Sequence, residues 1–477
     1  MYILKRAVIL LITVFVLYSC EQNKFINDPQ AGIRFSVDTL YFDTVFTELG
    51  TATRSFTIHN PHKDYIRISE LRLAKGTNSV FRINMDGVPG TDFRDIEIPP
   101  GDSLYVFVDA TLDPNGNNEI LLQQDSIVAF TNNRTQDIDL VAWGQDVHLL
   151  RAETLSTQTW INDKPYLVID YVYVDSLEVL TLEPGVQVYL HRDAIFAVGG
   201  TLIADGELEN PVKFSGDRLE ALYEDVPGQW GGIWMFAGSK DNIMDYVEIK
   251  GATFGMIVDT FMNDNPTLIF TNSVIRNISS VGLLARGSRI VGYNDVLANC
   301  GSSALALIIG GSYEFNHITV ANSSFGTPLS GGPPRNEPSV YLSNYYLYKD
   351  ANDVTQVEIR DIEKASFGNS IIWGSHSNEL FIDKYPDEGT LNYFFDHCII
   401  RYNQEDLQVS DEFFPGLISE DPGFISWEDY DFQLDTLSIA KDAGKLEIGN
   451  LFPVDLLGNS RIADLKPDIG AYERIED

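Results

Sequence analysis

A short pattern that returns six times constrains the fold of this chain more than any other feature. The six segments begin at Asp245, Asn272, Asn294, Asn316, Asn369 and Asp396. In each, a side-chain amide or carboxylate leads, and a small or β-branched residue follows two positions later. A unit this short cannot bury its own apolar face and must stack on its neighbours. The repeat therefore predicts an all-β solenoid of parallel strands.

The spacing of these segments predicts how the coils are built. Consecutive segments are 27, 22, 22, 53 and 27 residues apart, and we interpret the doubled step as two coils with a loop at residues 324–337. Residues 340–348 then form the strand of the intervening coil. The leading Asn and Asp fit the bend before each strand, since they bond local backbone and tolerate left-handed φ values. Within the third segment, Val296 is expected to face the interior and Asp295 to face outward.

Residues 1–19 have the pattern of a secretory signal. Basic residues precede an apolar run that ends in Leu17-Tyr18-Ser19-Cys20, and the run is short for a membrane span. The last four residues resemble a bacterial lipobox, in which the cysteine after the cleavage site is acylated. The resemblance implies lipidation of Cys20, with an ordinary cleaved signal peptide as the alternative. Residues 20–32 are polar and are expected to form a tether.

Residues 33–151 change to the pattern of alternating strands. Val106 and Val108 point one way and Tyr105 and Phe107 the other. Turn signals separate about seven such short strands, which is typical of an immunoglobulin-like sandwich. We therefore expect an N-terminal Ig-like β-sandwich ahead of the solenoid.

Two later stretches indicate the remaining architecture by resemblance. Residues 177–216 and the sequence PGQWGGIWMF at 227–236 resemble the first coils of bacterial envelope proteins with right-handed parallel β-helix repeats. Residues 468–473, with the sequence DIGAYE, resemble the end of the choice-of-anchor DIGAYE family, which is associated with envelope anchoring. The resemblance implies a right-handed parallel β-helix over residues 152–420 and a C-terminal capping segment over residues 421–477.

Composition limits the partners. The chain carries 69 acidic and 33 basic residues and a formal charge of −36, which disfavours nucleic acid and anionic lipid surfaces. It also opposes polyuronate substrates unless calcium bridges them. Cys20, Cys300 and Cys398 are too few for a disulfide framework in an exported protein. The seven histidines show no ligand spacing, and we predict no metal site and no cofactor.

Catalysis has weak candidates. Many parallel β-helix proteins are polysaccharide lyases or hydrolases, and Asp396 with His397 looks like a lyase Asp-His pair. Asp383, Lys384 and Arg401 complete the nearest approach to such a site. No paired-arginine motif or acidic calcium triad accompanies them. Because Asp396 also occupies a repeat position, a structural role explains it. The carboxylate motifs of the β-helical hydrolases are absent.

Ligand binding has a different set of candidates. Tyr341, Tyr345, Tyr346 and Tyr348 crowd one predicted strand. Alternation sends one pair away from the core, and exposed tyrosines suit stacking on a sugar ring. The alternative is that the loop at residues 324–337 folds over them.

A further pattern concerns location. Asp followed by Ser or Thr and an aliphatic residue resembles an O-glycosylation motif of one phylum of Gram-negative bacteria. It begins at Asp38, Asp43, Asp102, Asp125, Asp175 and Asp435. Ordinary turn chemistry also explains each site alone, whereas the six together favour a glycosylated, periplasmic or surface location.

These observations predict an outer-membrane lipoprotein whose β-helix binds glycans or surface proteins, or is presented to them. The membrane is a predicted partner through the lipid anchor. One alternative is a polysaccharide lyase or glycoside hydrolase on the same fold. Another is a structural or adhesive spacer.

Overall fold

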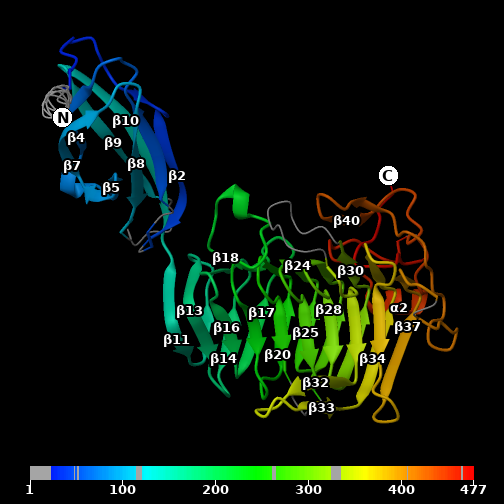
Figure 1. The fold of residues 1–477 in the computed structure, drawn as a ribbon. Helices are drawn as coiled ribbons and strands as arrows, with labels where there is room; N and C mark the ends of the chain where they lie inside the picture. The colour runs from blue at the N-terminus through cyan, green and yellow to red at the C-terminus, as the bar shows by residue number, and fades with distance from the viewer. Residues whose placement is uncertain are drawn as a thin grey trace, which may run out of the picture. The chain divides into compact units, whose positions relative to one another are not determined.

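The computed structural model of the chain describes residues 23–47, 49–50, 53–113, 121–259, 265–323, 335–404, 407–463 and 466–476. Cys20 and the expected signal lie outside the described residues. The chain divides into two compact units, Met1–Asp146 and Val147–Asp477, each with its own apolar core (Figure 1). Within the described residues, no helix is long and apolar enough to cross a membrane.

Unit 1 consists of two five-stranded sheets around one core, in the orders β1-β3-β8-β5-β6 and β2-β10-β9-β4-β7. Along β8, Val106 and Val108 are buried, whereas Tyr105 and Phe107 are 58% and 40% exposed, which confirms the predicted alternation. The strands are β1 (Arg34–Phe35), β2 (Thr39–Phe46), β3 (Arg54–His59), β4 (Ile66–Leu73), β5 (Phe81–Met85), β6 (Val88–Gly90), β7 (Asp92–Ile98), β8 (Ser103–Ala110), β9 (Leu121–Thr131) and β10 (Arg134–Gln145).

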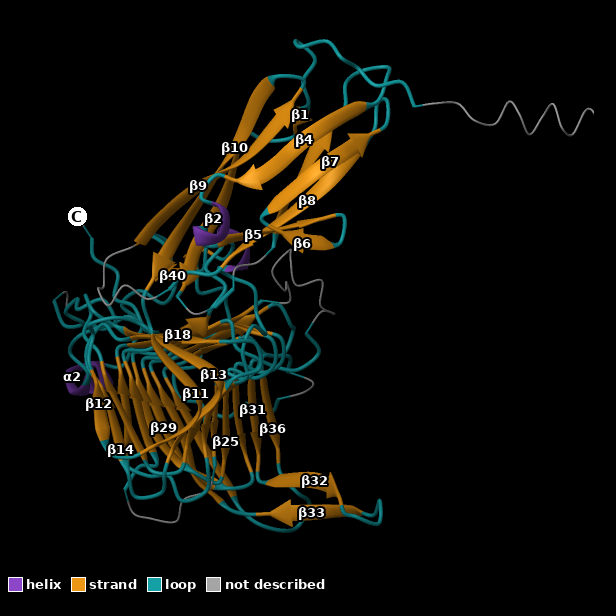
Figure 2. Ribbon diagram, turned by 90° about the vertical axis from the view of Figure 1, so that its left-hand side faces the viewer, coloured by secondary structure: helices purple, strands orange, loops and turns teal. Residues whose placement is uncertain are grey.

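Unit 2 is a stack of parallel strands that is nearly closed like a β-helix (Figures 1 and 2). Each coil adds one strand to a nine-stranded sheet, composed of β12 (Gln158–Trp160), β14 (Val179–Leu182), β17 (Thr201–Asp205), β20 (Asn242–Asp245), β23 (Leu268–Thr271), β26 (Arg289–Tyr293), β29 (Gly311–Asn316), β34 (Ile362–Gly368) and β37 (Leu391–Asp396). The all-β class and the parallel stack predicted from the repeat are confirmed.

A second sheet of 17 strands begins with β11 (His148–Leu155) and β13 (Tyr166–Val174) and then divides into two arms. Arm 1 contains β15 (Gln187–Leu190), β18 (Val212–Gly216), β21 (Val247–Lys250), β24 (Val274–Ile278), β27 (Val296–Cys300), β30 (Thr319–Asn322), β35 (Ile371–Gly374) and β38 (Ile399–Ile400). Arm 2 contains β16 (Ile195–Val198), β19 (Gly232–Met235), β22 (Met256–Val258), β25 (Leu283–Arg286), β28 (Leu305–Ile308), β31 (Val340–Ser343) and β36 (Leu380–Asp383).

Aromatic columns fix the register of the coils in the interior. Phe315, Phe367 and Phe395 occupy equivalent positions on β29, β34 and β37. Their ring centroids are 5.4 and 4.7 Å apart. Because each buried phenyl group contributes about 1.5–3 kcal/mol, a slip of one residue would turn this column outward and lose that contribution.

The corner before arm 1 is a ladder of left-handed residues, and it corrects the alignment predicted from the repeat. The stacked corner residues, each with a φ between 44 and 57°, are Tyr246, Asn272, Asn294, His317, Asn369 and His397. Three of the predicted leading residues, Asp245, Asn316 and Asp396, lie one position earlier, at the end of the preceding strand. The pattern mixed two adjacent positions, the last residue of the preceding strand and the corner residue, because Asp and Asn occur at both.

The doubled step between Asn316 and Asn369 is one coil and not two. β29 pairs directly with β34, and β30 pairs directly with β35. The additional length lies in residues 323–339, between β30 and β31, and in a hairpin after β31. The hairpin comprises β32 (Tyr345–Lys349) and β33 (Thr355–Ile359) and extends away from the stack (Figure 2). The expected intervening coil is therefore wrong.

The register of β27 is shifted by one residue from our expectation. Leu297 belongs to the interior core, whereas Val296 faces outward and is buried against the C-terminal segment. Asp295 is completely buried rather than exposed. Its Oδ1 accepts a 3.1 Å hydrogen bond from the Ser273 amide, and burial raises its pKa well above the usual value.

The described residues of the C-terminal segment, 421–463 and 466–476, lie along arm 1, although the sequence suggested a cap for the final coil. Leu407 and Phe414 close the interior core instead, and Phe414 stacks on Phe395 at 5.1 Å. The later segment contains β39 (Phe424–Ser426), β40 (Asp431–Leu434) and the short helix α2 (Leu446–Leu451). It shares a second apolar cluster with the outward side chains of β27, β30 and β35.

Candidate functional sites

The outward side chains of arm 1 form two rows that run along the stack. Outer row 1 contains Gln187, Lys213, Glu248, Val274, Val296, Thr319, Ile371 and Ile399. Outer row 2 contains Tyr189, Ser215, Lys250, Arg276, Ala298, Ala321 and Trp373. Both rows are polar over β15, β18 and β21 and become apolar from β27 onward. We call these two parts the open half and the covered half, with β24 as the boundary.

The DIGAYE motif holds the C-terminal segment on the covered half. The Gly470 amide donates to the Asn369 carbonyl oxygen at 2.8 Å, and the Ala471 amide donates to Thr319 Oγ1 at 2.9 Å. Gly470 has a φ of +107°, and a Cβ there would lie 2.8 Å from Ile371 Cδ1. The glycine is therefore required by both its conformation and its close approach to β35.

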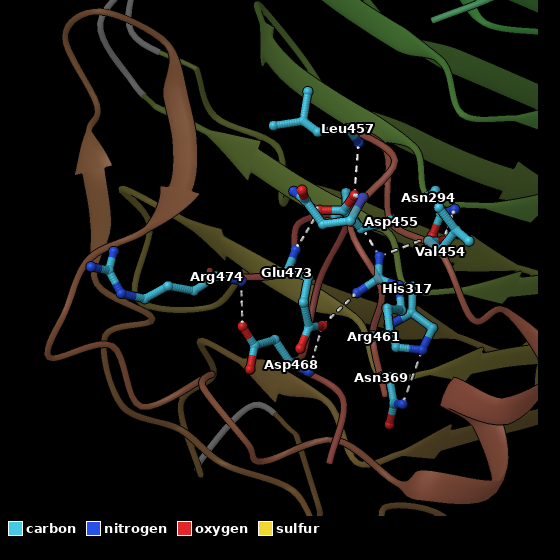
Figure 3. Close-up of polar contacts among 12 residues, drawn as sticks. Asn294, His317, Asn369, Val454, Asp455, Leu457, Arg461, Asp468, Glu473 and Arg474 are labelled. Atoms are coloured by element: carbon cyan, nitrogen blue, oxygen red, sulfur yellow. Dashed lines mark hydrogen bonds and ion pairs between the residues drawn. The ribbon is translucent and has the colours of Figure 1, made fainter. Parts of the chain in front are cut away.

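A buried polar cluster connects the motif to the corner ladder (Figure 3). The guanidinium of Arg461, which is fully buried, donates to Asn294 Oδ1 and to the Ala471 carbonyl oxygen, each at 2.9 Å. It also forms a 3.4 Å ion pair with Glu473. Burial lowers the pKa of Arg461 to about 10, although Glu473, Asp455 and Asp468 act in the opposite direction.

The carboxylates of the cluster are held by backbone amides. Asp455 Oδ2 accepts the Glu473 amide at 2.7 Å, and Asp468 Oδ2 accepts the Arg474 amide at 2.7 Å. Two rungs beyond Asn294 in the corner ladder, Asn369 Oδ1 accepts the Lys445 amide at 2.7 Å. The DIGAYE residues that the resemblance associates with anchoring therefore have a structural role in this chain.

The open half forms a groove, which the sequence did not reveal. A cavity of about 340 Å³ lies over β15, β18 and β21, and the loop at residues 217–229 forms its wall. A second cavity of about 430 Å³ continues over β24 and β27 and ends at the C-terminal segment. Side chains shared by the two cavities are Glu224 and Glu248. We call the two cavities together the arm 1 groove.

The first cavity is mainly basic and aromatic. Its charged lining residues are Lys213, Arg218, Lys250, Glu224 and Glu248, and its tyrosines are Tyr189 and Tyr223. The Arg218 guanidinium lies 3.9 Å from the centroid of the Tyr223 ring and makes a bidentate pair with Glu220. This arrangement fixes a flat surface at the edge of the groove.

The second cavity is mainly acidic. It is lined by Glu224, Asp225, Glu248 and Asp429, with Arg276 as its cation. The Arg276 guanidinium donates to Glu248 Oε1 at 3.0 and 3.1 Å and to Asp225 Oδ1 at 2.9 Å. These contacts raise the pKa of Arg276, against the opposing effect of burial.

The structure brings two of the three weak catalytic candidates together and leaves Lys384 apart from them. Asp396 Oδ1 lies 2.7 Å from His397 Nδ1. Lys384 follows β36 on the other sheet and is exposed. The cation at Asp396 is Lys445, whose Nζ lies 2.7 Å from Oδ2. Asp396 and His397 therefore form part of the contact between the corner ladder and the C-terminal segment.

The four candidate tyrosines do not share one strand, because the chain leaves the coil at Asn344. Tyr341 lies on β31 and stacks on Phe381 at 5.5 Å. Tyr345 begins the hairpin and donates a 2.5 Å hydrogen bond to Asp383, which raises the pKa of Tyr345 to about 12. Tyr346 and Tyr348 are 48% and 44% exposed. Most of the loop proposed to cover them, residues 324–334, lies outside the described residues.

Turn chemistry is present at several of the Asp-Ser and Asp-Thr sites. The carboxylates of Asp102, Asp125 and Asp175 each accept the following residue's amide at 2.8 Å. Asp435 accepts the Thr436 amide at 2.5 Å. These contacts explain the aspartates locally, and glycosylation of the hydroxyl residues stays a prediction.

The only sequence signal for the arm 1 groove is the alternation of residues along single strands. Alternation shows which side chains of one strand point outward, but it does not show which strands are neighbours. Lys213, Glu248 and Arg276 are separated by tens of residues. Only the coil register places them side by side. A search for compact motifs therefore could not have found the site.

Comparison with known proteins gives no family. No protein-family model matches the chain, and no curated protein matches it. Matching solved structures include the E. coli chaperone DraB (7% identity, 23% of this chain, 54% of that chain), a family 123 glycoside hydrolase from Clostridium perfringens (7%, 24% and 26%) and a protein of unknown function from Porphyromonas gingivalis W83 (10%, 26% and 60%). The chain covers less than two thirds of each, and every TM-score is 0.17, so the fold rests on the structure itself.

Proposed function

We propose that this chain is an acylated envelope lipoprotein whose solenoid unit binds glycans. In this proposal Cys20 carries the lipid anchor, unit 1 is an immunoglobulin-like spacer, and unit 2 is a right-handed parallel β-helix of the choice-of-anchor DIGAYE type. The protein belongs in the outer membrane of a Gram-negative bacterium. The lipobox, the two-sheet unit and the parallel stack support these assignments.

The arm 1 groove is the observation that carries the binding function. It combines tyrosine faces, amide groups and charged side chains on a rigid sheet. Tyrosine offers a flat apolar surface together with a hydroxyl group, which suits the two faces and the hydroxyl rim of a sugar. Because the strand rows repeat at about 4.8 Å, the groove offers repeating contacts to an extended oligosaccharide.

Binding is tested with the full chain in detergent on a glycan array, followed by titration with each glycan retained. Tyr223→Ala is expected to weaken binding at least several-fold, because it removes the fixed aromatic surface. Tyr105→Ala, which removes an exposed tyrosine of unit 1 outside the groove, is the control. Tyr346→Ala tests the hairpin tyrosines as the alternative site. Loss of binding in that variant alone would move the site to the hairpin.

The same samples distinguish the other two functions. Glu248 and Arg276 bring an acid and a cation together in the groove, so cleavage is measured alongside binding. New unsaturated sugar ends that depend on Glu248 would place the protein among the lyases. Failure to retain any glycan would favour a structural or adhesive spacer.

The anchor is tested separately. Cys20→Ala is expected to release the chain from the membrane fraction, because acyl chains supply the membrane affinity. Metabolic acyl labelling should be lost in the same variant. A wild type without acyl label would contradict the lipoprotein assignment.

A further inference from the structure

The two cavities of the arm 1 groove differ in charge, although the chain as a whole is strongly acidic. Three of the five charged residues around the first cavity are cations, whereas four of the five around the second are carboxylates. The groove is therefore polarised along the stack. A ligand that extends through both cavities has one end beside the lysines and the other beside the carboxylates.

The two lysines of the first cavity have donors available to a ligand. Lys213 Nζ lies 3.9 Å from Glu248 Oε2, and Lys250 Nζ lies 4.0 Å from Glu224 Oε1. Both distances exceed those of hydrogen bonds. The two residues lie on neighbouring strands, about 4.8 Å apart in the stacking direction, but Lys250 is on outer row 2, two residues along the strand from the register partner of Lys213. This offset of about 6.6 Å is within the combined reach of two lysine side chains, so both ammonium groups can approach one anionic group.

The other cations of the groove are already engaged. Arg218 makes its bidentate pair with Glu220, and Arg276 is shared between Glu248 and Asp225. Asp225 Oδ1 also accepts the Asn277 amide at 2.8 Å. The carboxylate end is thus a preformed set of acceptors for hydroxyl groups, and a second anion there would be repelled.

We propose that the groove binds an acidic oligosaccharide whose negative groups are separated by neutral sugars, with one carboxylate held by Lys213 and Lys250. The neighbouring neutral sugar lies at the carboxylate end and donates its hydroxyl groups to Asp225 and Asp429. A polymer with an acid on every sugar is disfavoured, because it must bring a carboxylate to this end. This inference rests on the proposed glycan-binding function and specifies its ligand.

The test compares three probes by titration against the full chain in detergent. They are an alternating glucuronate and N-acetylglucosamine tetrasaccharide, the same tetrasaccharide with its carboxyl groups reduced, and tetragalacturonate. The acidic alternating probe is expected to bind about ten-fold more tightly than its reduced form. The difference should shrink as salt rises, because partly exposed charges are screened.

The variant Lys213→Gln with Lys250→Gln is expected to remove this preference, so that the acidic probe and its reduced form bind with the same affinity. Lys364→Gln, an exposed lysine paired with Glu314 on the nine-stranded sheet, is the matched control. Unchanged thermal unfolding of the double variant shows that the groove is still folded.

The outcomes separate the inference from the function on which it rests. Equal binding of the acidic and reduced probes, or a preference that survives in the double variant, overturns the inference and leaves glycan binding in place. If tetragalacturonate binds most tightly of the three probes, the inferred spacing of negative groups in the ligand is wrong. Failure of every probe and of the whole glycan array overturns both.

Discussion

The open and covered halves of arm 1 have the same backbone and opposite surfaces. Over β15, β18 and β21 the outward rows carry Gln187, Tyr189, Lys213, Glu248 and Lys250. Over β27, β30 and β35 the same rows carry Val, Ala, Ile and Trp together with the buried Thr319. The apolar side chains pack against the C-terminal segment. In a parallel stack the interior core is formed by the inward side chains. The outward side chains can therefore vary, and they decide whether a face binds a ligand or another part of the chain.

The comparison also explains the position of the DIGAYE motif. An uncovered apolar face on several coils would favour association, and the motif supplies the cover. Within the covered half, its backbone amides donate to the carbonyl oxygen of the corner residue Asn369 and to the Thr319 hydroxyl on β30. The same segment provides Asp429, Tyr430 and Tyr472 to the end of the arm 1 groove. Closing one half of the arm therefore shapes the site on the other.

The largest expected effect comes from removing the buried cation of the covered half. Arg461→Ala should destabilise unit 2 by about 3–5 kcal/mol, because the buried Glu473 carboxylate would lose its cation. Arg218→Ala in the open half removes an exposed pair, which is worth at most about 1 kcal/mol. Thermal unfolding of both variants measures the difference. Similar losses of stability in the two variants would mean that the covered half does not depend on its buried charge more than the open half depends on its exposed pair.

Loss of packing on the covered half should have the next largest effect. Ile371 faces outward but is fully buried, so Ile371→Ala should cost roughly 2–4 kcal/mol. Limited proteolysis should then cut within residues 421–477 before it cuts the coils. A variant with wild-type stability and proteolysis would show that the segment is not held by this face.

The boundary between the halves should respond to pH. Burial raises the pKa of Asp295, so the folded chain holds this proton more tightly than the unfolded chain. The associated stabilisation is complete below the unfolded value, about 3.9, and is lost as pH rises through the folded value. Because Asn does not ionise, Asp295→Asn should gain stability relative to wild type as pH rises.

Chemical denaturation across pH measures that gain. Asp205→Asn, an exposed position on β17, serves as the matched control. A difference between Asp295→Asn and wild type that stays constant from acid to neutral pH would contradict the buried neutral acid.

The smallest expected effect lies in the open half. Lys213 is half exposed and its ion pair is long, so Lys213→Ala should change the free energy of unfolding by no more than about 0.5 kcal/mol. Thermal unfolding beside Ile371→Ala, which lies on the same outer row, gives the direct comparison. A loss as large as that of Ile371→Ala would mean that the open half also supports the fold.

The sequence by itself determined the all-β class, the parallel stack and the alternation along β8. Each follows from local signals, because the repeat needs neighbours to bury its apolar face and a strand alternates with period two. The left-handed corner was also predictable at Asn272, Asn294 and Asn369, whose side chains favour that conformation. Tyr246, His317 and His397 occupy the same corner, but each follows an Asp or Asn that the pattern selected instead, so the repeat pattern was off by one there.

Only the tertiary structure decided which face each side chain joined. Val296 and Leu297 are both apolar, and their assignment to the outside and the inside depends on a cover that comes from residues 421–477. The doubled step was misinterpreted because an insertion and an additional coil have the same length in sequence. The arm 1 groove required the register of several coils, since residues far apart in the chain become neighbours only when the strands stack.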